Sequence, residues 1–302
     1  MMAFLECKDV IKIYTGLNSE VQVAALRGIE LSGNEGELIA IVGPSGSGKS
    51  TLIKMLGGLE PASSGEITVG ENVITSMTRR QLNRFRRESV GFLYQFPRRN
   101  LMWNLTILKN VIIPMKLAGN LSGTEKKIRA KQLLEDVGLK NRIKHKPSQL
   151  SGGEAQRAGI AVALANDPEI LLADEPTGEL DSATTLNIID YFKELNYSLG
   201  KTFLVVTHDL RFARMTDKVL RIKDGRIIGV QGILGPETPD GEREELTFVD
   251  DDGNMRIPEN IRRETGIGNY VRIEARNGKA CLIPVNSVEK NETRKDFKKR
   301  KT

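Results

Sequence analysis

Cysteine, histidine, tryptophan and long hydrophobic runs are all scarce in this chain. Its two cysteines, Cys7 and Cys281, are too few for a disulfide framework or a four-cysteine zinc site. We therefore expect both thiols in the packed cores of a reduced, cytosolic protein. No apolar stretch reaches the roughly 18 residues that cross a bilayer, and the first ten residues lack the pattern of a secretory signal. Work at a membrane would need a separate chain that spans it.

Net charge is modest and unevenly placed. The 302 residues carry a formal charge of +6, and residues 289–302 hold seven Lys or Arg and three Asp or Glu, which is four of those six charges. The rest is close to neutral, so basicity is weak evidence for a nucleic-acid partner. We expect the tail to be a solvated, mobile end, with contact to anionic lipid or nucleic acid as the alternative. The length predicts about two domains.

A glycine-rich segment stands between a buried strand and a helix. Residues 38–42 form an uninterrupted apolar run typical of a buried strand, and residues 51–56 are compatible with a helix. A glycine-rich loop between a strand and a helix is the pattern of a phosphate-binding P-loop. Its glycines turn backbone N–H groups around phosphate oxygens, and the helix N-terminus adds its positive dipole end. Lys49 can then reach the β- and γ-phosphates, while Ser50 can offer its hydroxyl to Mg²⁺. The segment that fits the P-loop pattern is Gly43, Pro44, Ser45, Gly46, Ser47, Gly48, Lys49, Ser50 and Thr51.

Two adjacent acids end a second strand-like run. Residues 170–173 are apolar, and Asp174 and Glu175 follow them. Without a P-loop, such a pair would be interpreted as a strand end that meets solvent. Beside a P-loop, Asp174 is placed to hold Mg²⁺ directly or through water, and Glu175 to polarise the attacking water as a general base.

A second candidate anion site precedes an alanine-rich helix. Leu150 is followed by Ser151, Gly152, Gly153 and Glu154. Small residues at a helix N-terminus expose backbone donors of the same kind as those of the P-loop. The chain thus has two phosphate-recognition loops but only one P-loop, which is explained if the second loop faces a nucleotide held by another copy.

In this order, the motifs resemble those of the ATP-binding cassette (ABC) ATPases over about residues 4–230. Residues 43–51 match Walker A, 150–154 the signature, 170–175 Walker B and 178–181 the D-loop. Single residues also match: Gln95 the Q-loop, His208 the switch histidine, Asp181 the D-loop aspartate and Tyr14 the aromatic that stacks on adenine.

The resemblance implies ATP and Mg²⁺ as ligands and a role for each matched residue. Gln95 would reach Mg²⁺ or the lytic water, and His208 would hydrogen-bond the γ-phosphate and that water. An ordinary strand aromatic remains the alternative for Tyr14, and a cap at a strand end the alternative for His208.

The implied fold is α/β, with a RecA-like P-loop core, an antiparallel β subdomain and a helical subdomain at about 96–155, all within an ABC domain of residues 1–231. The implied partners are a second copy, joined head to tail with two ATP molecules between the copies, and an integral membrane permease. The chain would then lie in the cytoplasm, on the inner face of the cell membrane.

The helical subdomain carries its own signals. Ser122 to Glu125 predicts a capping box, followed by a helix that buries Leu134, Val137 and their neighbours on one face and stops at Gly138. The apolar face is predicted to hold Ile128, Leu133, Leu134 and Val137. Residues 96–105, around Leu101 and Trp103, are the candidate docking surface for the permease.

Residues 173–181, together with 57–60, resemble the lipoprotein-release, macrolide-export and cell-division branch of the family. The sequence departs from the usual residues of that branch at Glu179 and at 97–100. The predicted function is therefore an ATP-hydrolysing subunit that powers a separate permease of the export or release type. The alternatives are an ATPase of a membrane signalling or division complex without solute transport, and a soluble ABC protein acting on nucleic acid.

The chain continues beyond the cassette. Residues 232–245 are predicted to be a linker, residues 246–287 a small domain and residues 288–302 a basic tail. About 40 residues cannot easily bury a core alone. The order of strand, Pro258 at a helix start, strand, hairpin signal at Asn277-Gly278 and strand resembles the AbrB-like swapped-hairpin family. This resemblance implies a dimerisation or regulatory domain, with nucleic-acid binding through Arg256, Arg262, Arg263 and Arg272 as the alternative.

Overall fold

The computed structural model describes residues 3–15, 22–178, 180–232, 244–246, 255, 257, 259–267, 271–276 and 279–284. The chain divides into two compact units, Met1–Leu246 and Thr247–Thr302. Several sequence predictions fall outside the described residues: Glu179, most of the linker, Arg256, Pro258, the Asn277-Gly278 hairpin signal and the tail.

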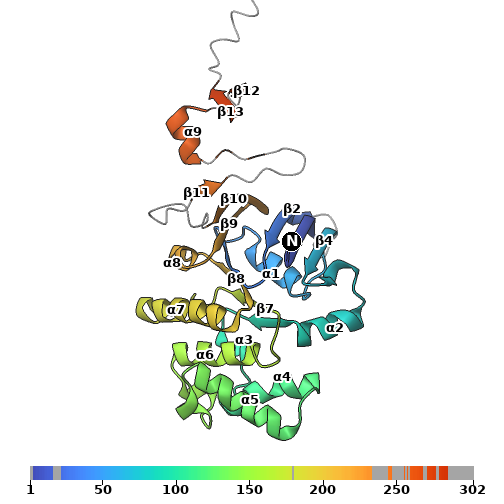
Figure 1. Ribbon diagram of the computed structural model, residues 1–302, viewed down its shortest axis with the longest axis vertical. Helices are drawn as coiled ribbons and strands as arrows, with labels where there is room; N and C mark the ends of the chain where they lie inside the picture. Colours follow the sequence, from blue (N-terminus) through green and yellow to red (C-terminus); the bar gives the residue numbers. More distant parts are fainter. Residues whose placement is uncertain are drawn as a thin grey trace, which may run out of the picture. The chain divides into compact units, whose positions relative to one another are not determined.

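The larger sheet of the first unit carries the predicted P-loop core (Figure 1). Strands β9, β3, β8, β7 and β6 run parallel, and β10 and β11 add to the β9 edge in the antiparallel sense. Every residue of β3, β7 and β8 is buried, as expected for strands covered by helices on both faces. In spatial order the strands are β11 (Glu244–Leu246), β10 (Arg226–Gly232), β9 (Lys218–Lys223), β3 (Leu38–Val42), β8 (Thr202–Thr207), β7 (Ile170–Asp174) and β6 (Val90–Leu93).

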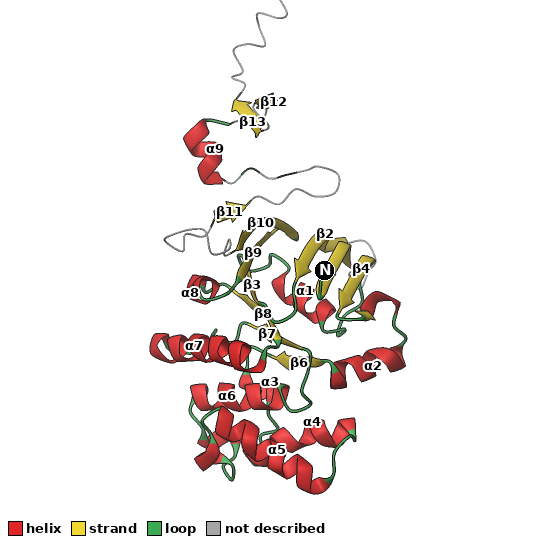
Figure 2. Cartoon of the chain, in the orientation of Figure 1, coloured by secondary structure: helices red, strands yellow, loops and turns green. Residues whose placement is uncertain are grey.

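Helices cover both faces of this sheet (Figure 2). On one face lies α1 (Lys49–Leu56), whose following residue, Gly57, contacts Leu172 of β7. The other face packs against α7 (Ser182–Leu199), where the Phe192 ring meets the Phe203 ring edge to face at 6.0 Å. The helices α2 (Arg79–Glu88) and α8 (Leu210–Arg214) flank the sheet. This two-sided burial fixes the loops at the strand ends, where the predicted site residues lie.

The second sheet is the predicted antiparallel β subdomain. Its order is β2-β1-β4-β5, and every neighbouring pair is antiparallel. The short 3₁₀ helix η1 (Ile74–Ser76) follows it. The strands are β2 (Gln22–Gly33), β1 (Leu5–Thr15), β4 (Ser64–Val69) and β5 (Asn72–Val73).

The predicted helical subdomain forms a separate apolar cluster. The capping box at Ser122 and Glu125 is confirmed, and α5 ends at Asp136, just before Gly138 with φ of +70°. The prediction for Ile128 was wrong, since its side chain is 64% exposed. The buried face follows Ala130, Leu134 and Val137 at helical spacing, and Ile128 lies about 200° round the helix from Ala130. The elements are α3 (Pro97–Asn100), α4 (Ile107–Ala118), α5 (Gly123–Asp136), η2 (Lys140–Arg142), η3 (Pro147–Gln149) and α6 (Gly152–Ala163).

The candidate docking segment is only partly exposed. Leu101 is buried in the helical cluster and therefore adds no exposed surface to this segment. Phe96, Met102 and Trp103 do present exposed surface. Within the described residues, the structure contains no helix that is both apolar enough and long enough to span a bilayer.

The second unit contains α9 (Glu259–Thr265) and a hairpin of β12 (Val271–Arg276) and β13 (Lys279–Pro284). Both hairpin strands were predicted from the sequence. The strand β11, which overlaps the predicted linker and the first residue of the predicted C-terminal domain, pairs with β10 in the first unit. Cys7 is buried as expected, whereas Cys281 in β13 is partly exposed.

Candidate functional site

The site lies where four neighbouring parallel strands end. The P-loop follows β3, His208 follows β8, and Glu175 follows β7, while Gln95 lies two residues beyond β6. In open α/β sheets, ligands bind outside the carboxyl ends of the strands. Sheet topology therefore brings together residues that are up to 165 positions apart in the sequence.

Backbone conformation shapes the P-loop. Gly46 and Gly48 have φ of +76° and +102°, which L-residues rarely adopt. The Lys49 side chain, 7% exposed, donates from Nζ to the carbonyl oxygens of Gly43 at 2.8 Å and Pro44 at 3.1 Å. The ammonium group is thus held beside the loop, in position for a polyphosphate.

The β9–β10 turn forms a hydrogen bond with the same loop. Gly225 donates its N–H to the Ser47 carbonyl at 3.1 Å, and its own carbonyl accepts from the Arg27 N–H at 2.8 Å. A Cβ at Gly43 would lie 2.1 Å from the Ile222 carbonyl oxygen. The antiparallel sheet and the strand pair β9–β10 therefore fix the P-loop together.

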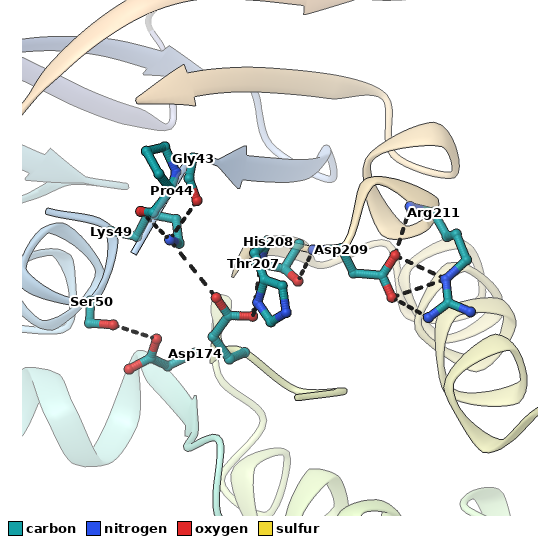
Figure 3. A network of polar contacts seen from close by, with 10 residues as sticks. Gly43, Pro44, Lys49, Ser50, Asp174, Thr207, His208, Asp209 and Arg211 are labelled. Carbon is teal, nitrogen blue, oxygen red and sulfur yellow. Dashed lines mark hydrogen bonds and ion pairs between the residues drawn. The ribbon is translucent and has the colours of Figure 1, made fainter. Parts of the chain in front are cut away.

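Ser50 and Asp174 form a candidate magnesium site (Figure 3). Ser50 Oγ donates to Asp174 Oδ1 at 2.9 Å, and Asp174 is 9% exposed. Burial raises the pKa of the Asp174 carboxyl, while the Ser50 hydrogen bond and the Lys54 charge act in the opposite direction. A divalent cation would stabilise the ionised carboxylate, and hydroxyl and carboxylate oxygens suit Mg²⁺. The donor set fits the metal.

Glu175 and His208 contact each other directly. Glu175 Oε2 lies 2.9 Å from His208 Nδ1, and Oε1 lies 3.9 Å from Lys49 Nζ. Glu175 has φ of +48° and donates its N–H to the Val206 carbonyl at 2.8 Å. A non-glycine residue held in the left-handed region stores strain, and such residues cluster at functional sites.

These groups surround one cavity of about 580 Å³. Among its lining residues, Ala25 of β2 was missed by sequence reasoning, because a methyl group carries no chemical signal. Gly43 and Pro44 hold the Lys49 ammonium through their carbonyls. The buried Ser47 Oγ has no hydrogen-bond partner within the described structure. The lining residues are Ala25, Ser45, Gly46, Gly48, Lys49, Ser50, Thr51, Gln95, Glu175 and His208.

Gln95 also meets the D-loop segment. A Cβ at Gly178 would lie 3.0 Å from Gln95 Nε2, so glycine leaves room for that side chain. Gln95 lines the cavity together with Ser50 and Glu175. Its amide can therefore respond to whatever occupies the cavity.

Tyr14 lies outside the cavity lining. Its hydroxyl donates to the Glu60 carboxylate, and its ring, part of a side chain that is 40% exposed, has Lys12 Nζ at 4.9 Å from its centre. Burial and the Glu60 hydrogen bond raise the pKa of the Tyr14 hydroxyl. The exposed ring keeps a surface on which a flat base can stack.

The signature loop and the end of the D-loop start two neighbouring helices, α6 and α7. Ser151 caps α6, and Asp181 caps α7 by accepting from the N–H groups of Ala183 and Thr184. A Cβ at Gly153 would lie 2.6 Å from Thr184 Cγ2, so the two helix starts are in close contact. Neither Ser151 nor Asp181 lines the P-loop cavity of its own chain.

A P-loop lysine, a serine–aspartate pair and a strand-end glutamate at the edge of a parallel sheet define a P-loop ATPase. The sequence profile of the ABC transporter family matches residues 26–178. An uncharacterised ABC transporter ATP-binding protein of Thermotoga maritima is 46% identical over 231 residues, which are 76% of this chain and 96% of that one. The chain belongs to the ABC transporter family, as an ATP-binding cassette that hydrolyses ATP.

Other similar proteins are also ATP-binding cassettes. The lipoprotein-releasing system ATP-binding protein LolD of Pseudoalteromonas translucida is 43% identical over 223 residues, covering 74% of this chain and 94% of that protein. The dimeric structure of the cassette MJ0796 bound to ADP and Pi matches with a TM-score of 0.70 at 39% identity, over 76% of this chain and 99% of that chain.

Proposed function

We propose that this chain is the ATPase subunit of a release- or export-type transporter and works with a separate membrane permease. The observation that carries the proposal is the contact between Glu175, Lys49 and His208 at the strand ends, with Ser50 and Asp174 beside them. Similarity to LolD proteins supports the release branch. The permease would place the chain in the cytoplasm, at the inner face of the cell membrane.

In this proposal, each site residue has one chemical role. Lys49 Nζ would bind the β- and γ-phosphates. Ser50, Asp174 and Gln95 would hold Mg²⁺, which would neutralise phosphate charge. Glu175 accepts a proton from the attacking water, and His208 orients Glu175 and the γ-phosphate. P-loop residues 45–48 and 51 would bind phosphate through backbone N–H groups, whereas Gly43 and Pro44 hold Lys49 through their carbonyls. Tyr14 would stack on adenine.

A second copy completes the site. Ser151, Gly152, Gly153 and Asp181 lie outside the cavity of their own chain and would bind the nucleotide of the partner, while Glu154 of the same loop caps α6. The MJ0796 cassette, similar over three quarters of this chain, is dimeric with ADP and Pi. Phe96, Met102 and Trp103, which are exposed just after the Q-loop, are the surface for the permease.

The C-terminal unit is a dimerisation clamp of the AbrB-like kind. The β12–β13 register places Val271, Ile273, Leu282 and Pro284 on one face of the hairpin, and Ile273 is 68% exposed. A two-stranded hairpin is marginal alone, so this apolar face needs a cover, which a second copy supplies. Against nucleic-acid binding, Arg272, one of the candidate phosphate contacts, has its Nη1 atom 4.0 Å from Glu274 Oε1.

The transport proposal is tested by purifying the full chain from detergent-solubilised membranes of its source cells. We expect an integral membrane protein to co-purify in fixed ratio and to change the rate of ATP turnover. A control variant, Arg84→Ala, removes an exposed ion pair with Glu88 on α2, outside residues 96–105, and should keep the complex. Co-purification with nucleic acid and with no membrane protein would contradict the proposal.

A further inference from the structure

The signature loop carries a carboxylate where an anion is expected to dock. Glu154 is the third residue of α6, next to Gly152, Gly153 and the cap residue Ser151. A helix N-terminus attracts anions through its N–H groups and dipole. An uncompensated carboxylate at the same place would repel a polyphosphate, so its charge needs a counterpart.

Both oxygens of Glu154 are engaged. Oε2 accepts the Ser151 N–H at 2.9 Å, and Oε1 accepts from Arg142 Nε at 2.9 Å. These contacts lower the pKa of the Glu154 carboxyl, the Ser151 N–H first and the Arg142 guanidinium next. Ser151 Oγ accepts from the Glu154 N–H at 3.2 Å, which leaves its hydroxyl proton as a donor.

The backbone holds Arg142 in place. It ends η2, donates its N–H to the Leu139 carbonyl at 2.8 Å and accepts from the His145 N–H at 2.9 Å. Leu139 is buried in the helical cluster. The Arg142 guanidinium, held by this backbone, therefore contacts Glu154 twelve residues later in the sequence.

Capping alone does not require this arginine. Ser122 and Glu125 form the same capping box at α5, with the Ser122 N–H donating to the Glu125 carboxylate at 2.7 Å. In the described part of the chain, Glu125 forms no ion pair, and α5 is nevertheless capped. Arg142 must therefore serve something particular to the signature loop.

We propose that Arg142 is a positioning residue: it fixes the Glu154 carboxylate and cancels its charge, so that the signature loop accepts the polyphosphate of a nucleotide bound by a second copy. The inference rests on the proposed shared site. Arg142 acts through Glu154, and the Ser151 hydroxyl and the α6 N–H groups remain as donors to phosphate.

The test uses the full chain with Glu175→Gln, which should trap ATP between two copies. We measure the ATP concentration at which half of the protein retains nucleotide after rapid gel filtration. Arg142→Ala should raise this concentration about five- to tenfold, as expected for one unpaired charge near a phosphate in partly solvated surroundings. Lys140→Ala, which removes the neighbouring ion pair of η2 with Glu135, is the matched control and should not change it.

Rescue separates charge from folding. Adding Glu154→Gln to Arg142→Ala removes the uncompensated charge and should restore the concentration to within about twofold of the parent. Equal trapping by the parent and Arg142→Ala would overturn the inference, and so would an Arg142→Ala defect that Glu154→Gln does not repair. A parent that binds ATP but never traps it would show instead that the shared site is wrong, and the inference would fall with it.

Discussion

Two serines with the same structural role allow stability to be separated from function. Ser151 and Ser122 each cap a helix, accept from the N–H of a glutamate three residues on, at 3.2 and 3.3 Å, and have their own N–H bound by that glutamate. Replacing either by alanine removes one capping hydrogen bond. We expect each variant to lose about 1 kcal/mol of unfolding free energy, a fall of about 2–4 °C in Tm.

ATP turnover should distinguish the two variants. In the proposed shared site, the Ser151 hydroxyl would also donate to a phosphate of the partner's nucleotide, and a hydrogen bond to a charged group contributes about 1.5–3 kcal/mol. Ser151→Ala should therefore lower kcat/KM about ten- to a hundredfold, while Ser122→Ala stays close to wild type. The assay is steady-state phosphate release, with Tm measured on the same samples. Equal losses in the two variants would refute the assignment of Ser151, because stability alone would then explain them.

Three other outcomes are expected. Lys49→Ala should abolish measurable binding of Mg-ATP in equilibrium dialysis, because its ammonium is the cation held beside the P-loop; unchanged affinity would contradict that role. Removing residues 247–302 should leave ATP turnover intact and weaken self-association without nucleotide, as measured by sedimentation; an unchanged oligomer would exclude the clamp. Burial raises the pKa of the Cys7 thiol, so at pH 8 an alkylating agent should modify partly exposed Cys281 and leave Cys7 intact until the protein unfolds.

Local patterns predicted most of the cassette. The buried strand 38–42 and the capping box at Ser122 were predicted at the observed residues, because apolar runs and caps depend on nearby sequence. The direction of a helix face was harder: Ile128 was predicted to be buried, but neighbouring helices cover the side of α5 that carries Ala130 and Leu134. Leu101 likewise is buried by contacts that no local pattern encodes.

The sequence predicted which residues belong to the site, but only some of the contacts between them. Motif spacing identified Lys49, Ser50, Asp174, Glu175 and His208, and the topology of the sheet brings them together. Contacts through backbone atoms could not be found this way. Two contacts follow from how the two sheets meet: the Gly225 N–H donates to the Ser47 carbonyl, and the Ala25 methyl group lines the cavity.

In the proposed mechanism, Glu175 is the general base for ATP hydrolysis in this cavity. The most direct measurement compares phosphate release from Mg-ATP by the wild-type chain and by Glu175→Gln, with bound nucleotide determined in parallel. We expect the variant to bind ATP and to release phosphate at least about 10²–10⁴ times more slowly, the usual contribution of a general base. Equal rates in the two proteins would contradict the assignment of Glu175 as the general base.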